Sequence, residues 1–172
     1  NLAEIERHVA EDPSVLNNPI RGSLTALQFA ILRKDSESAG LLLSLGADPL
    51  VMTESDQTLL HLAVERGSAP IAAALLDTPI DLTARDKTGW TVWHQAAAKN
   101  DLELINLFAE RGHRPNTLSK LGGTALHEAA VRADAKMVGR LLELGVDPTV
   151  VSKDGRTALD IALEYENESA VE

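Results

Sequence analysis

Apolar and polar positions along this chain follow a pattern that recurs every 33 residues. The clearest markers are threonines at one fixed step: Thr25, Thr58, Thr91, Thr124 and Thr157. Each opens a short segment with apolar residues at helical spacing, in the order LTALQFA, QTLLHLA, WTVWHQA, GTALHEA and RTALDIA. A second apolar segment follows in the first four copies, as in LLLSLGADP from Leu41. The pattern predicts copies of one helical hairpin stacked in line.

Other columns of the repeat predict how each hairpin is capped, packed and closed. The Thr hydroxyl is expected to cap the first helix, and an Ala five residues later lets two helices approach closely. Two residues after each Thr comes a side chain expected in the core: Leu27, Leu60, Trp93, Leu126 or Leu159. A glycine column, in which Pro79 stands in the second copy, should end the second helix in a left-handed conformation: Gly46, Gly112 and Gly145. Asp56 replaces the turn glycine of the second copy, and Asp tolerates that conformation better than most residues.

These segments resemble the ankyrin repeat, whose consensus joins a TPLHxA segment to a later LLxxGAD. No copy has Pro after the Thr. The resemblance implies an all-α solenoid of antiparallel helix pairs joined by β-hairpin-like turns. We expect one domain over 1–172, with a half-repeat at 1–19, repeats at 20–52, 53–85, 86–118 and 119–151, and a shortened repeat at 152–172.

The two ends of the chain differ from the central copies. Residues 1–19 predict one amphipathic helix, with Leu2, Ile5 and Val9 on its apolar side, followed by a loop. The fifth copy keeps its first helix, over about 157–165, and the sequence stops near the expected start of its second. The first residue is Asn1 rather than Met, so we expect a longer parent protein.

Composition narrows the classes of function. The formal net charge is −10, which argues against general binding of nucleic acid or membrane surfaces. Cysteine is absent, which removes disulfides and thiolate chemistry and fits a reducing compartment. We therefore expect an intracellular, cytoplasmic protein that does not insert in membranes and is monomeric as this fragment.

Candidate chemistry is sparse. His61, His94 and His127 occupy one column, so they fall in successive repeats about 8–10 Å apart, too far to share a zinc ion. In the family this His braces the turn before the first helix. No nucleophile elbow or phosphate-binding loop is present. We therefore expect no enzyme activity, cofactor or metal; a convergent pocket holding a titratable group with a shifted pKa would favour an enzyme.

Two basic columns predict a binding surface. Eight residues after each Thr stand Arg33, Arg66, Lys99 and Arg132, with Tyr165 in the last copy. Four residues before each Thr, at the turn tips, stand Arg21, Glu54, Lys87, Lys120 and Lys153. We expect two positive stripes along the concave face, although a merely solvated helix face remains the alternative.

Apolar residues near the turn tips are candidate anchors for a partner. Trp90 stands where the family exposes its turns, and a Trp there is a candidate hot spot. Met52, Leu118, Leu121 and Val151 fall in or beside the turns; packing of turn against turn is the competing interpretation, favoured for Leu118 and Val151. Asn116 occupies a column that is hydroxylated in some family members.

The sequence therefore predicts a protein-interaction module of a scaffold, adaptor or regulatory protein. Its partner is expected to be an acidic or amphipathic peptide segment or domain. The alternative is a structural or autoinhibitory domain that packs on its own parent chain or self-associates. Nucleic-acid binding would use the same basic columns but lacks interleaved stacking aromatics.

Overall fold

The computed structural model describes residues 2–20 and 23–171, which form two compact units, Asn1–Ile80 and Asp81–Glu172. Helices are the only regular elements in these described residues, as the repeat pattern predicted. Arg21, the first of the predicted turn-tip cations, lies outside them.

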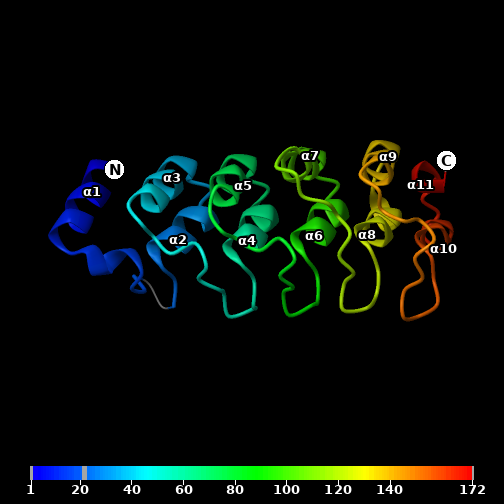
Figure 1. Cartoon of the computed structure of the whole chain (residues 1–172), viewed down its shortest axis with the longest axis horizontal. Coiled ribbons are helices and arrows are strands. Elements are labelled where there is room, and N and C mark those ends of the chain that lie inside the picture. The colour runs from blue at the N-terminus through cyan, green and yellow to red at the C-terminus, as the bar shows by residue number, and fades with distance from the viewer. Residues whose placement is uncertain (1, 21–22, 172) are drawn as a thin grey trace. The chain divides into compact units, whose positions relative to one another are not determined.

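The first unit holds a helical N-terminal segment and two helix pairs (Figure 1). The segment comprises α1 (Leu2–Glu11) and a short 3-10 helix, η1 (Pro13–Leu16). The pairs are α2 (Ala26–Leu32) with α3 (Ser36–Ser44), and α4 (Leu59–Arg66) with α5 (Ala69–Leu76). First helices pack on first helices and second helices on second helices, so the unit has two helical layers.

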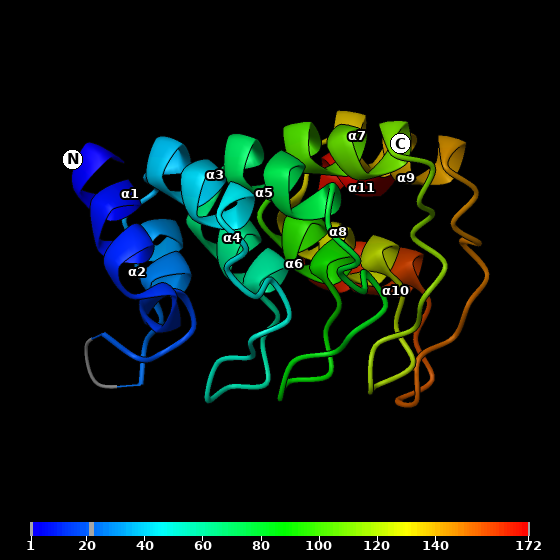
Figure 2. The ribbon, with the colours of Figure 1, turned by 60° about the vertical axis from the view of Figure 1, so that its left-hand side comes forward.

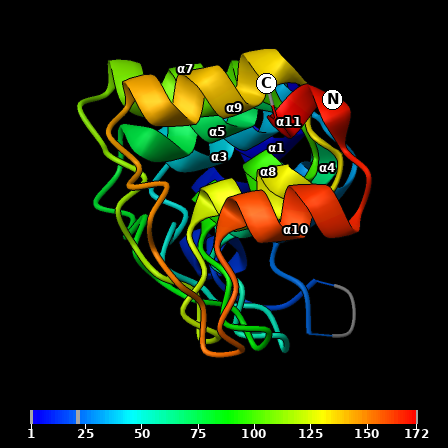
Figure 3. The same ribbon diagram turned by 90° about the vertical axis from the view of Figure 1, so that its right-hand side faces the viewer.

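The second unit repeats this arrangement. Its pairs are α6 (Val92–Ala98) with α7 (Leu102–Glu110), α8 (Ala125–Arg132) with α9 (Ala135–Glu143), and α10 (Ala158–Glu164) with the short α11 (Glu168–Val171). Figure 3 shows α7 and α9 in one layer and α8 and α10 in the other. The Arg140 guanidinium of α9 donates to Asn106 Oδ1 of α7 at 2.8 Å, which ties neighbouring second helices together.

Each predicted Thr is the N-cap residue of its helix, and in the first, second and fifth copies its hydroxyl accepts from a helix amide. In α2, Thr25 Oγ1 accepts from the Gln28 amide at 3.3 Å, while Gln28 Oε1 accepts from the Thr25 amide at 2.9 Å. This reciprocal pair satisfies two helix-end donors at once. The caps confirm where the first helices begin.

The core is built from the predicted columns, with one exception. Trp93 is 1 % exposed, and its ring meets Phe108 edge to face at a centroid distance of 5.2 Å. The prediction that Leu159 is a core residue is wrong, because this side chain is 51 % exposed. Helix α8, which carries Leu126, packs against α10 of the next copy, whereas the described chain has no further copy to cover Leu159.

The turns are hairpins, each closed by a backbone hydrogen bond between residues four apart. Within each unit they project from the same side (Figure 2). In the fourth copy the Ser119 amide donates to the Gly123 carbonyl at 2.7 Å. Asp56 has φ +55°, which confirms its left-handed role. Where Pro79 replaces glycine, the helix ends differently, and the Thr78 hydroxyl donates to the Leu75 carbonyl at 2.6 Å. The sequence predicted that this helix end would differ, but not which bond would close it.

Candidate partner-binding face

The basic column at the ends of the first helices is exposed at three of its four positions. Lys99 follows α6 and Arg132 ends α8, and no ion pair within the described residues holds either side chain. In the first unit, the Arg33 guanidinium carbon lies 5.8 Å from the Phe29 ring centroid. Arg66 is half-buried, and its guanidinium lies 3.5 Å from the Glu65 carboxylate. Such a surface pair contributes only about 0–1 kcal/mol, so it holds Arg66 loosely.

The turn-tip lysines of the second unit follow one another in regular order. Lys87, Lys120 and Lys153 are all exposed. The Lys120 amide donates to the Gly89 carbonyl at 3.0 Å, and the Lys153 amide donates to the Leu121 carbonyl at 2.9 Å. These bonds join successive turns and fix the spacing of the lysines, which the column alone could not establish.

The predicted apolar anchors differ in exposure. Leu121 is 67 % exposed and Met52 is 45 % exposed, so both offer apolar surface at the turns. Leu118 and Val151 are also exposed. Trp90 is half-buried rather than fully exposed, and its backbone closes a turn with Asp86 through bonds of 2.9 and 3.1 Å. Asn116 is exposed.

The histidine column braces the turns, as the family resemblance implied. The Thr91 amide donates to His94 Nδ1 at 3.2 Å, so the ring proton sits on Nε2, which lies 3.1 Å from the Gly123 carbonyl of the next turn. His127 makes the same bonds to Thr124 and to the Arg156 carbonyl. Burial lowers the pKa of His94 to about 4, and it also lowers the pKa of His127. Both rings therefore stay neutral near pH 7.

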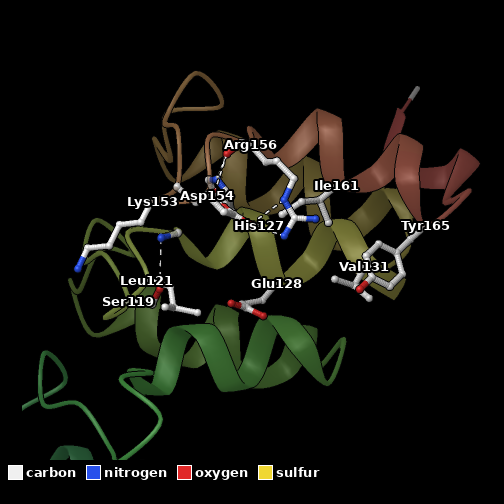
Figure 4. A pocket seen from close by; sticks show the side chains of 12 residues that line it. Ser119, Leu121, His127, Glu128, Val131, Lys153, Asp154, Arg156, Ile161 and Tyr165 are labelled. Carbon is white, nitrogen blue, oxygen red and sulfur yellow. Dashed lines mark hydrogen bonds and ion pairs between the residues drawn. The ribbon is translucent and has the colours of Figure 1, made fainter.

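A pocket of about 410 Å³ lies between the fourth and fifth copies of the repeat, both of which belong to the second unit (Figure 4). Its apolar walls come from Leu121, Val131, Ile161 and Tyr165, and its polar lining includes Glu128, Lys153 and Arg156. The pocket opens beside the turn-tip lysines and the end of α8. It thus belongs to the surface that the basic columns mark in this unit.

Glu128 is the unusual group in this pocket. It lies in the first turn of α8, and burial raises the pKa of its carboxyl from 4.5 to about 7. No hydrogen bond or ion pair reaches that carboxyl from the described residues, and Figure 4 marks none. An unpaired carboxylate in such a place is costly, so Glu128 is a candidate functional group.

One cation of the pocket lining, Arg156, is already bonded to other carboxylates. Arg156 donates through Nε to Asp154 Oδ2 at 2.7 Å and through Nη1 to Glu164 Oε2 at 2.5 Å. These bonds raise the pKa of Arg156, and the hydrogen bond from the Ser152 hydroxyl, together with that from Arg156, lowers the pKa of Asp154. The guanidinium is therefore committed to carboxylates other than Glu128.

A pocket with a shifted carboxyl is the feature that would favour an enzyme. Several of its other polar groups are bonded within the turns. Ser119 Oγ accepts from the Gly123 amide at 3.2 Å, Ser152 Oγ lies 2.8 Å from the Arg156 carbonyl, and both His127 nitrogens are bonded. The described residues also contain no group of three or more His, Asp or Glu side chains placed to hold a metal ion.

The sequence contained a signal for Glu128 that the two basic columns did not reveal. Four residues after each Thr stand Phe29, Leu62, Gln95, Glu128 and Ile161. Glu128 is the one charged member of this column. The first unit has a corresponding groove, lined by Gln28, Met52 and Leu62 among others, without a charged residue in this column.

The stacked helix pairs, with their capped helices and braced turns, define a helical-repeat protein. A family model described as ankyrin repeats, in three copies, matches residues 27–117 and 93–172. The chain therefore belongs to the ankyrin-repeat family. Ankyrin repeats are generally protein–protein interaction modules and are typically non-catalytic. No curated protein matches the chain, and none of its described helices is long and apolar enough to cross a membrane.

Proposed function

We propose that this chain is a non-catalytic protein-interaction module of a larger scaffold, adaptor or regulatory protein. It binds an acidic, partly apolar partner segment on the face formed by the turns and the first helices. The observation that carries the proposal is a set of exposed cations in the second unit that form no ion pair within the described residues, Lys99 and Arg132 at the ends of first helices and Lys120 and Lys153 at the turns. They occur in a chain whose formal net charge is −10.

The charges and the apolar residues have different parts in this proposal. Exposed pairs contribute only about 0–1 kcal/mol each, so the cations steer and orient the segment. Affinity comes from apolar contacts with Trp90, Leu121 and, in the first unit, Met52. The half-buried Trp90 is already partly ordered, and preorganisation lowers the entropic cost of using it as an anchor.

Charge reversal tests this proposal. The variant Arg66→Glu/Lys99→Glu/Arg132→Glu should lose the proteins that wild type retains in quantitative affinity purification, and Trp90→Ala should weaken their retention. A matched control, Arg7→Glu/Arg114→Glu/Lys136→Glu, changes the net charge equally at exposed positions elsewhere and should retain them. Thermal unfolding should be nearly the same for the two triple variants. Unaltered retention by the first triple variant would remove the proposal.

The alternative of packing on the parent chain, or on a second copy, gives a different result in the same set of experiments. The isolated chain would then bind its own parent protein, or elute as a dimer in size-exclusion chromatography, in place of binding a separate partner. Labelled RNA and DNA provide the remaining comparison, and a gel shift abolished by charge reversal would replace the protein partner with a nucleic acid.

A further inference from the structure

The pocket between α8 and α10 combines three features that are unusual together. Its walls are mostly apolar, its volume of about 410 Å³ accommodates a long side chain, and the Glu128 carboxyl in its lining has no hydrogen-bond or ion-pair partner among the described residues. Of the five residues in its column, only Glu128 is charged. A purely apolar occupant would remove the remaining water from this carboxyl and leave it unpaired, which is unfavourable.

An ion pair between Glu128 and a cation of the same chain is the first alternative to an external partner. Arg132 lies one helical turn further along α8, at a spacing where Glu and Arg often meet, yet it is exposed and makes no ion pair with Glu128 in the described structure. Arg156 is bonded to Asp154 and Glu164. The other polar side chains of the pocket lining are Lys153, Asp154, Ser119, Ser152 and the neutral His127, and none of them makes a hydrogen bond or ion pair with Glu128 in the described structure. Within the described residues, no cation is paired with this carboxyl.

We propose that this pocket receives one arginine or lysine side chain of the partner, with its aliphatic stem against Leu121, Val131 and Ile161 and its cationic head on Glu128. Long basic side chains suit such a site because the stem is apolar and only the end is charged. A guanidinium offers several donors to a carboxylate. The pairing replaces the water that burial removes from Glu128.

This inference rests on the proposed function and makes it more specific. The partner segment is acidic where it meets the lysines and Arg132, and it carries a single basic residue at the position that enters the pocket. One such residue fixes the register of the segment, because any other register places an acidic or apolar side chain on Glu128. Specificity of this kind comes from penalising the wrong alignment.

Small probes of equal chain length test the pocket without knowledge of the partner. Hexylguanidinium, 1-hexanol and hexanoate are titrated into isotope-labelled protein at pH 8, and shifts are followed by NMR at Leu121, Val131 and Ile161. Hexylguanidinium should give saturable shifts and bind about fivefold to tenfold more tightly than hexanol, as expected for one charged hydrogen bond at a partly exposed site. Hexanoate should bind most weakly.

Variants assign the preference to Glu128. In Glu128→Gln, a change that keeps the shape of the side chain, the advantage of hexylguanidinium over hexanol should disappear. Glu110→Gln, at an exposed position of α7, should keep it, and Arg132→Gln should keep or strengthen it. Equal binding of hexanol and hexylguanidinium to wild type, a preference for hexanoate, or an absence of saturable shifts at the pocket would each overturn the inference.

The hexylguanidinium titration and the charge-reversal experiment can fail independently of each other. If hexylguanidinium does not bind, the charge-reversal experiment with the partner still decides whether the basic columns bind protein. If charge reversal has no effect but the guanidinium binds at Glu128, the acidic-segment proposal fails while the pocket stands as a site for cationic side chains.

Discussion

At the scale of single residues, burial decides the chemistry of this chain more than residue type does. His94 and Glu128 are both titratable and both shielded from water. The imidazole is neutral and fully hydrogen-bonded, so it is structural. No described residue forms a hydrogen bond or ion pair with the carboxyl. Its burial therefore costs free energy, and a ligand that pairs with it can remove that cost.

Glu128 should make the protein less stable in mild base. Its folded pKa, about 7, lies above the unfolded value of 4.5, so its favourable contribution is full below pH 4.5 and is lost as pH rises through 7. Glu128→Gln should therefore raise the free energy of unfolding at pH 8 by about 1–3 kcal/mol, and change it little at pH 4. Urea denaturation at the two pH values measures this.

The control for this prediction is Glu110→Gln, which removes an exposed carboxyl. It should leave the free energy of unfolding nearly the same at both pH values, because surface substitutions away from special features change it by only about 0.5 kcal/mol. If Glu128→Gln destabilised the protein at pH 8, the carboxylate would have a favourable partner, and the unpaired state argued above would be wrong.

At the scale of elements, each hairpin turn depends on backbone approach to the next. Gly89 and Gly155 have nearly the same left-handed φ, +87° and +82°. They differ in their surroundings, because a Cβ on Gly89 would lie 2.1 Å from Lys120 Cβ, whereas nothing lies within 4 Å of one on Gly155. The turn column that contains Asp56, Gly89, Gly122 and Gly155 therefore carries two separate constraints in its different copies.

Alanine at these two positions should separate the two constraints. Gly155→Ala should cost about 1–2 kcal/mol, the conformational penalty alone. Gly89→Ala should cost at least about 1 kcal/mol more, because the turns must move apart and the bond between the Lys120 amide and the Gly89 carbonyl is lost. Chemical denaturation of both variants gives the difference, and equal costs would show that the turns move apart freely.

At the scale of the whole molecule, stability should follow the number of neighbours that each helix has. Helices α1 and α11 contain no buried residue, whereas most of α6 and α8 is buried. In repeat proteins each copy is stabilised mainly by adjacent copies. The terminal helices are therefore the least supported parts of the described chain.

Amide hydrogen exchange should report this gradient. After correction for intrinsic rates, amides of α1 and α11 should exchange about tenfold or more faster than those of α6 and α8, because local opening costs less free energy where little surface is buried. Mass spectrometry of peptides from each helix measures the rates. Uniform protection along the chain would contradict nearest-neighbour stabilisation.

Sequence periodicity alone determined the class of fold and the start of each first helix. It could do so because a Thr cap, a small Ala and a left-handed Gly are local requirements that recur at a fixed step. The tertiary structure decided what depends on neighbours. Leu159 is exposed because no further copy in the described chain covers it, and Trp90 is half-buried where its turn closes. Glu128 is unusual only because apolar walls from two copies shield it while no cation of the described pocket lining pairs with it, and no single copy of the repeat contains that information.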